Sequence, residues 1–182
     1  MLLTAALVEA GHDVAVQDLD PQRTARRWVR AVGSGLKLAE GGKSYSSLVI
    51  DTPPRLDAPE VTKAIRQADL VIVVSSPSPA DLFASQDTAA LIRSLQAENK
   101  TRLLFNNVKA GTILARALDD FAQQIGLESF RNHIPQRQAY QHAAVLGWKS
   151  LPSVVREELL RFAVEVTGLY GKLVNSKVSN VA

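Results

Sequence analysis

Residues 14–22 read Val-Ala-Val-Gln-Asp-Leu-Asp-Pro-Gln, and residues 48–54 read Leu-Val-Ile-Asp-Thr-Pro-Pro. In each stretch a short apolar run, typical of a buried strand, ends in a carboxylate. Open α/β sheets bind their ligands beyond the carboxyl ends of the strands, and a carboxylate at that edge can hold Mg²⁺ directly or through water. The two stretches therefore predict an α/β nucleotide-binding fold whose acidic side chains face a phosphate-bound metal.

Short apolar strands alternate with helical segments along the rest of the chain. Strands are expected near residues 13–18, 47–51, 69–75, 102–108 and 129–134, and helices near 2–10, 21–31, 59–67, 81–98, 112–125, 137–146 and 153–174. This alternation favours a mostly parallel sheet with helices on both faces. Because no repeat or linker divides the chain, residues 1–182 are predicted to form a single domain with a frayed tail at 175–182.

The composition limits the class of protein. Of the 182 residues 46% are hydrophobic, which is enough for a core of ordinary size. The absence of cysteine excludes disulfides, thiolate metal sites and iron–sulfur clusters. The sequence contains no run of about 18 apolar residues, so no membrane-spanning helix is predicted. The first 91 residues carry nine Lys and Arg against eleven Asp and Glu, whereas the second half carries twelve against seven. The charge alone favours an ordinary solvated surface, and a basic face for nucleic acid in the second half is the alternative.

The three strand-end acids each have two interpretations. Asp51 can hold a metal, or it can simply cap a turn. Alternation along a strand would place Asp18 and Asp20 on one face, about 7 Å apart. Two carboxylates so close repel each other unless a cation or a donor lies between them, but a pair of solvated acids at the start of a loop is the alternative.

A phosphate-binding loop is expected before the helix at residues 2–10 in such a fold, and the sequence has none there. Residues 40–44, Glu-Gly-Gly-Lys-Ser, resemble the end of such a loop, but Lys37 stands where its first glycine should be. The segment also precedes a strand instead of joining a strand to a helix. It is therefore predicted to be a turn.

Taken together and in order, several short motifs resemble the landmarks of ParA-type partition ATPases, which belong to the ParA/MinD family of deviant Walker-A proteins. The motifs are residues 18–22 (Asp-Leu-Asp-Pro-Gln), 49–54 (Val-Ile-Asp-Thr-Pro-Pro), 68–73 (Ala-Asp-Leu-Val-Ile-Val), 77–82 (Pro-Ser-Pro-Ala-Asp-Leu), 105–108 (Phe-Asn-Asn-Val) and 137–140 (Arg-Gln-Ala-Tyr). The resemblance runs from about residue 2 to 170. It implies a sheet of the P-loop NTPase type, here without its first strand and phosphate loop, so that the chain is expected to be N-terminally truncated and inactive as given.

The resemblance also implies roles for particular residues. Asp51 matches the aspartate that helps to hold Mg²⁺ near the γ-phosphate of ATP. Asp18 and Asp20 match an acidic pair that serves metal coordination and positions the attacking water. Asn106 matches the asparagine that reads the adenine edge, and Pro135 lies in the loop that binds the base.

In that family ATP joins two monomers into a homodimer, which binds DNA non-specifically through basic residues, and a ParB-like partner stimulates hydrolysis. The resemblance thus implies a cytoplasmic protein associated with the nucleoid. Membrane association is not expected, because the tail of the chain lacks the basic, strongly apolar end of a membrane-surface helix. The candidates for DNA contact are Arg131, Arg137, Lys149, Arg156 and Arg161. Phosphate contacts need only charge on one face, and an ordinarily charged helical surface is the alternative.

Two functions follow from the resemblance. The first is a ParA-like ATPase of plasmid or chromosome partition, acting as an ATP-dependent dimer switch. The second is a natural pseudo-ATPase that does not hydrolyse ATP and serves as a DNA-binding or regulatory partner of a full-length relative. Retention of Asp18, Asp20 and Asp51 favours the first. The short stretch between Gln22 and Leu48 and the polar Gln17 within a strand favour the second.

Overall fold

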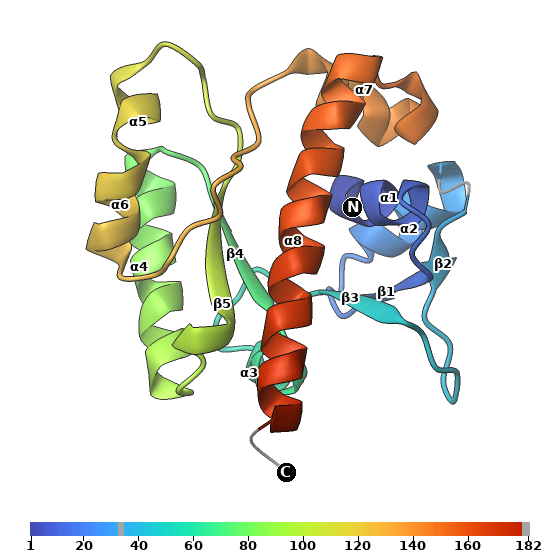
Figure 1. Ribbon diagram of the computed structural model, residues 1–182, viewed down its shortest axis with the longest axis horizontal. Helices are drawn as coiled ribbons and strands as arrows, with labels where there is room; N and C mark the ends of the chain where they lie inside the picture. Colours follow the sequence, from blue (N-terminus) through green and yellow to red (C-terminus); the bar gives the residue numbers. More distant parts are fainter. Residues whose placement is uncertain (33–34, 180–182) are drawn as a thin grey trace. The chain divides into compact units, whose positions relative to one another are not determined.

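The computed structural model describes residues 1–32 and 35–179, with side chains as far as residue 175. Residues 180–182 of the predicted tail lie outside this part. The chain divides into two compact units (Figure 1). Unit 1 comprises Met1–Val61 and Arg137–Ala163, and unit 2 comprises Thr62–Gln136 and the chain from Val164 onward. The single domain predicted from the sequence stays a prediction.

Unit 1 contains a parallel sheet of three strands in the order β2-β1-β3. Its elements are α1 (Leu2–Glu9), β1 (Val14–Asp18), α2 (Thr24–Val32), β2 (Lys37–Leu38), β3 (Ser47–Asp51), α7 (Gln138–Leu146) and η2 (Trp148–Ser150). Both α1 and α2 pack against β1. Consecutive residues of β1, Val14, Ala15 and Val16, are therefore all buried, as expected for a central parallel strand.

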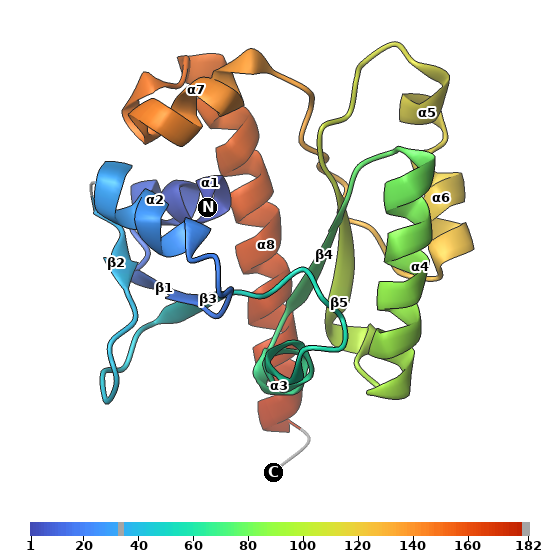
Figure 2. The ribbon, with the colours of Figure 1, turned by 180° about the vertical axis from the view of Figure 1, so that it is seen from behind.

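Unit 2 contains a parallel pair of strands, β4 and β5. Its elements are β4 (Val71–Ser75), α4 (Pro79–Ser94), η1 (Glu98–Lys100), β5 (Thr101–Phe105), α5 (Ile113–Arg116) and α6 (Leu118–Ile125). The helix α4 packs against β4 and α6, as seen from both sides in Figures 1 and 2. Two helices span the unit boundary, α3 (Pro59–Gln67) and α8 (Ser153–Ser179). The predicted parallel α/β fold is confirmed, with its strands in two small sheets.

Several element boundaries differ from the predicted ones. The helix predicted at 112–125 is interrupted at Ala117 and forms α5 and α6, and α8 continues past residue 174 to Ser179. The cap of α4 is Ser78, whose hydroxyl accepts a hydrogen bond from the Asp81 backbone N–H at 3.3 Å, so Asp81 lies in the first turn instead of starting the helix. The predicted end near residue 125 is confirmed, because α6 ends at Ile125 and Gly126 after it has the left-handed conformation that glycine favours.

The strand predicted at 129–134 was wrong as a regular strand. The segment meets β5 through single backbone hydrogen bonds. The N–H of Phe130 donates to Leu103 O at 2.9 Å, and the N–H of Ile134 donates to Phe105 O at 2.9 Å. These bonds satisfy buried backbone groups without the regular register of a ladder. The sequence predicts an extended segment near residues 129–134, but it does not predict that the segment pairs with β5 only irregularly.

The residues predicted as a false phosphate loop form a turn, as expected. Gly42 has a positive φ of 79°, and the backbone N–H of Lys43 donates to Glu40 O at 3.3 Å. The segment leads into β3. A glycine is suited to this conformation because it lacks a Cβ.

One side of β3 and one side of β4 have no strand partner within the described residues. β3 pairs only with β1, and β4 pairs only with β5. Leu48 of β3 is 46% exposed and Val74 of β4 is 58% exposed.

Among the described helices none is both long and apolar enough to cross a membrane.

Gly147 fixes the link between α7 and η2, and its replacement is expected to be costly. Its φ of 80° and ψ of −179° are strained for any L side chain, and an added Cβ would lie 2.9 Å from Val32 O. We expect Gly147→Ala to lower the free energy of unfolding by about 1–3 kcal/mol or more, measured by urea denaturation. Gly168→Ala is the matched control. It lies within α8 with nothing within 4 Å of its Cβ, so it should be neutral or stabilising. An equal loss in both variants would contradict this account.

Candidate functional site

Asp18 is the last residue of β1, and its carboxylate holds the start of α2. Asp18 Oδ1 accepts a hydrogen bond from the Asp20 N–H at 3.0 Å, and Oδ2 accepts one from the Arg26 N–H at 2.8 Å. These bonds satisfy backbone donors of the turn and of the first turn of α2. Because β1 ends at Asp18, Asp20 lies in the turn. The predicted alternation of the two acids along one strand face is therefore wrong.

Asp51 ends β3 directly beside Asp18. The two residues are paired in the register of β1 and β3, and the Leu19 N–H donates to Asp51 O at 2.8 Å. Burial raises the pKa of the Asp51 carboxyl, and the charges of Asp18 and Asp20 raise it further, while the α-amino group of Met1 opposes the shift. The three predicted carboxylates of unit 1 therefore lie close enough together for their negative charges to repel one another.

Asp18, Asp20 and Asp51 form an acidic cluster. It suits a partly hydrated divalent cation better than an ion that is enclosed entirely by protein ligands. None of the ion pairs between described residues involves Asp18, Asp20 or Asp51, so their charge is uncompensated by lysine or arginine. Nor does any group of three or more His, Cys, Asp or Glu in the described chain form a ready metal site. Mg²⁺ commonly binds one or two carboxylates and takes its other ligands from water and phosphate. Asp51 fits such an ion best, because both oxygens of Asp18 and Oδ1 of Asp20 already accept hydrogen bonds from backbone N–H groups.

Asn106 and Pro135, the predicted base-binding residues, lie beyond the carboxyl end of β5 in unit 2. Asn106 is exposed, and its backbone N–H donates to Ser75 O at 2.8 Å. Pro135 forms an isolated parallel bridge with Val108, two residues after Asn106. The structure thus places both near one strand end, where an exposed amide could contact a ligand. Their roles toward adenine stay predictions.

The five basic residues predicted to contact DNA differ in the exposure and in the hydrogen bonds of their side chains. Arg131 lies in unit 2, and the other four lie in unit 1. Arg131, Lys149 and Arg161 are exposed, whereas Arg156 is half-buried with Nε lacking a hydrogen-bond partner. Arg137 makes a two-point contact with the Glu158 carboxylate, in which Nε donates at 2.9 Å. A phosphate would have to compete with this carboxylate for Arg137.

Two glutamates of α8, which no motif in the sequence predicts as site residues, hold neighbouring segments through hydrogen bonds. Glu158 accepts hydrogen bonds from Arg137 and from the Tyr140 hydroxyl, the latter at 3.1 Å. Glu165 accepts bonds from the backbone N–H groups of Arg131 at 2.7 Å and Asn132 at 3.0 Å. The seven-residue spacing of the two glutamates, two turns of one helix, was the available signal.

The phenol of Tyr140 provides a test of the Glu158 contact. Burial and the neighbouring Glu158 charge raise the pKa of Tyr140 to about 12. Since the folded chain favours the neutral phenol, its stabilising contribution is present below about pH 10 and is lost as the pH rises through about 12. We expect Glu158→Gln to lower this pKa, measured by phenolate absorbance with Tyr140→Phe as the reference. An unchanged Tyr140 pKa would show that Glu158 does not influence it.

No protein-family model matches the chain. Two curated relatives are named maintenance of carboxysome distribution protein A. The protein from Halothiobacillus neapolitanus is 26% identical over 166 residues, covering 80% of this chain and 76% of the relative. The protein from Gloeobacter kilaueensis is 28% identical over 160 residues, covering 79% of this chain and 72% of the relative.

Solved structures with a similar backbone include MinD cell division protein of Aquifex aeolicus, with a TM-score of 0.72 and 14% identity over 92% of this chain and 89% of that one. A ParA family ATPase of Chlorobium tepidum has a TM-score of 0.65 and 14% identity, covering 90% of each chain. Apo McdA of Cyanthece has a TM-score of 0.63 and 15% identity over 90% of this chain and 94% of that one. The predicted ParA/MinD-like fold is confirmed by these likenesses.

Proposed function

Since this chain has a ParA/MinD-like fold, we propose that it is a ParA-like positioning protein, which distributes a cellular cargo by a nucleotide-dependent dimer switch. The observation that carries the proposal is the acidic cluster at the carboxyl ends of β1 and β3. Burial and like charge raise the pKa of Asp51, so its ionised form is disfavoured unless a cation is near. A carboxylate in this position is explained if it binds a cation that accompanies a nucleotide.

In this proposal each predicted site residue has a role. Asp51 and Asp18 would hold Mg²⁺, directly or through water, and Asp18 and Asp20 would position the attacking water. Asn106 contacts the adenine edge beside the loop that contains Pro135. Bound Mg²⁺ supplies positive charge next to the phosphates of ATP. The residues of the chain provide position and electrostatics.

The cargo and partners are proposed from the relatives. Both curated relatives are named for carboxysome distribution, so a protein body of that kind is our first proposal for the cargo. A DNA replicon is the second, because a similar structure bound to AMPPNP comes from a Borrelia burgdorferi protein assigned to plasmid partition. The homodimer would bind non-specific DNA on the nucleoid in the cytoplasm through Arg131, Lys149 and Arg161. A ParB-like protein would stimulate hydrolysis.

A second candidate function is a relative that does not hydrolyse ATP and acts as a DNA-binding or regulatory partner. The hydrogen bonds of Asp18 favour it, because both of its oxygens accept backbone N–H groups and so have a structural use without a metal. In this case Asp18 would be retained for the start of α2. The two candidates differ in their response to ATP.

Sedimentation velocity of the purified chain tests the proposal. We expect any nucleotide response that the chain retains to require Mg²⁺-ATP and not to appear with ADP or with ATP and EDTA, and we expect it to consist of a shift from monomer to dimer that allows cosedimentation with duplex DNA. Phosphate release, measured in parallel, distinguishes the two candidates. A folded chain that binds DNA without any nucleotide response would favour the second candidate. A folded chain that responds to neither ligand would contradict the first candidate and the DNA-binding form of the second, and would leave only a regulatory partner of a full-length relative.

A further inference from the structure

The basic residues of the first half of the chain are concentrated on one element of unit 1, the helix α2. Four of the nine Lys and Arg residues among residues 1–91 fall within residues 23–30, at Arg23, Arg26, Arg27 and Arg30. Neither this segment nor the rest of α2 contains Asp or Glu. The slightly acidic balance of the first half therefore conceals a strongly positive helix, which a comparison of the two halves does not predict.

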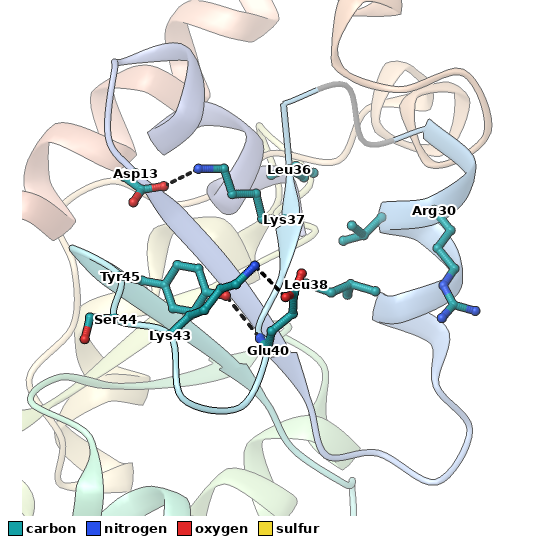
Figure 3. Close-up of a pocket in the computed structure, with 10 residues that line it drawn as sticks. Asp13, Arg30, Leu36, Lys37, Leu38, Glu40, Lys43, Ser44 and Tyr45 are labelled. Carbon is teal, nitrogen blue, oxygen red and sulfur yellow. Dashed lines mark hydrogen bonds and ion pairs between the residues drawn. The ribbon is translucent and has the colours of Figure 1, made fainter.

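The charges of these four arginines are not neutralised within the described part of the chain. None of the ion pairs between described residues involves any of them. Arg30 lines a pocket together with Asp13 and Glu40, but these carboxylates pair with Lys37 at 2.8 Å and with Lys43 at 2.6 Å. Figure 3 shows both pairs, and it shows the guanidinium of Arg30 pointing away from the apolar residues of that pocket. The positive charge of α2 is therefore available to a ligand outside the pocket.

Three of the arginines form an exposed surface, which we call the arginine face. Arg27 and Arg30 are exposed and three residues apart, so their side chains are neighbours on the surface of α2. Arg23 is also exposed and lies one turn earlier, because its carbonyl accepts the Arg27 N–H at 3.0 Å. Ala25 and Val29 of the same helix are buried. Their burial holds the helix against the unit with the arginine face toward solvent.

The arginine face suits a ligand with closely spaced negative charges that needs no apolar contact. Within the described residues, α2 exposes no large apolar side chain. A protein interface usually has an apolar core, and a membrane-surface helix inserts an apolar face, so α2 offers little to either partner. Duplex DNA carries about one phosphate per 1.7 Å of its axis and is bound through charge alone. A guanidinium group can also contact one phosphate through two N–H groups.

We propose that the arginine face of α2 contacts the phosphate backbone of duplex DNA without regard to base sequence. The identity of the partner rests on the proposed function, but none of the three arginines is among the five predicted DNA contacts. The face lies in the same unit as one of those contacts, Lys149. α2 packs against α7, and Gly147, two residues before Lys149, lies against Val32 at the end of α2. The arginine face thus extends the proposed DNA surface of unit 1.

Fluorescence anisotropy of a labelled duplex of arbitrary sequence tests the inference on the intact chain. Binding is measured at several salt concentrations, without nucleotide and with Mg²⁺-ATP. We expect the triple substitution Arg23→Ala, Arg27→Ala and Arg30→Ala to weaken binding about tenfold or more at a fixed salt concentration. Because fewer counterions are released when phosphate contacts are lost, the slope of log K against log salt should become shallower by about 0.9 per contact.

Two further variants separate the effect of charge from an effect on the fold. The triple lysine variant keeps a positive charge at all three positions, so it should keep the salt slope and most of the affinity. Lys63→Ala with Arg66→Ala removes two exposed charges of α3, outside the arginine face, and should change neither quantity. Circular dichroism and thermal unfolding verify that each variant is folded, which we expect because alanine favours a helix.

The outcomes distinguish a failure of this inference from a failure of the proposed function. If the triple alanine variant retains DNA binding with an unchanged salt slope, the arginine face alone is overturned, and Arg131, Lys149 and Arg161 remain the proposed contacts. If the folded, unaltered chain binds no DNA in either condition, the inference fails together with the DNA-binding part of the proposed function. A labelled polyglutamate peptide that binds as tightly as the duplex, through the same arginines, would assign the face to an acidic protein and overturn the DNA partner.

Discussion

Replacing Asp51 by asparagine is expected to abolish any residual Mg²⁺-dependent binding of ATP. The substitution keeps the size of the side chain but removes the negative charge that would attract the cation. Charge-assisted contacts to a cation in a half-buried site are strong, so we expect affinity to fall by about a hundredfold or more. Titration with a fluorescent ATP analogue, with and without Mg²⁺, measures the loss.

The same substitution should leave the fold intact or make it more stable in the absence of Mg²⁺. The pKa of Asp51 is raised, so the folded chain disfavours the ionised carboxylate relative to the unfolded chain. The penalty is absent at low pH, where the carboxyl is protonated in both states, and appears as the pH rises through the raised pKa. Above that pH the asparagine variant lacks the penalty. Thermal unfolding at neutral pH should therefore give a Tm that is equal or higher.

Asp87→Asn is the control for both measurements, because Asp87 is an exposed carboxylate on α4 outside the acidic cluster. It should change neither the nucleotide response nor the Tm. If Asp51→Asn retained Mg²⁺-dependent binding, Asp51 would have no place in the site. A marked fall in Tm would instead show that the charge of Asp51 stabilises the fold.

Replacing Leu103 by alanine is expected to give the largest loss of stability. Leu103 lies in the middle of β5 and is 0% exposed, and its backbone N–H donates to Glu128 O at 2.8 Å. β5 is hydrogen-bonded to β4 on one side and to Glu128 on the other, so it cannot easily move inward. Truncation of the buried Leu103 side chain therefore leaves a cavity. Such substitutions cost about 2–5 kcal/mol, and the midpoint of urea unfolding should fall accordingly.

Val74→Ala on the neighbouring strand is the matched control. Val74 is an aliphatic residue of β4 in the same pair of strands but is 58% exposed, so its truncation should cost less than about 1 kcal/mol. The two variants together separate burial from strand propensity. Equal losses would mean that burial does not decide the effect.

Local patterns in the sequence predict the elements well because they depend on nearby residues. The apolar runs before Asp18 and Asp51 form β1 and β3, and the glycine at 126 ends α6. The pairing of β1 with β2, a strand of two residues, was not predictable from so short a segment. Nor was the irregular meeting of residues 128–134 with β5, since single bridges leave no periodicity in the sequence.

The candidate site was predictable in part for the same reason. Asp18 and Asp51 come together because parallel strands end at one edge, a rule that holds for any such sheet. The use of both Asp18 oxygens by backbone N–H groups depends on the path of the turn into α2, which no motif specifies. The pairing of Arg137 with Glu158 joins residues 21 apart in the chain and needs the tertiary fold.

The unpartnered sides of β3 and β4 have a practical consequence for work with this protein. A strand with free N–H and C=O groups along one side can pair with the same strand of another molecule, and exposed Leu48 and Val74 would add apolar contact. We therefore expect edge-to-edge association in concentrated samples. Dilute stocks and a light-scattering check at each concentration step are therefore needed before any sedimentation or anisotropy result is assigned to specific binding.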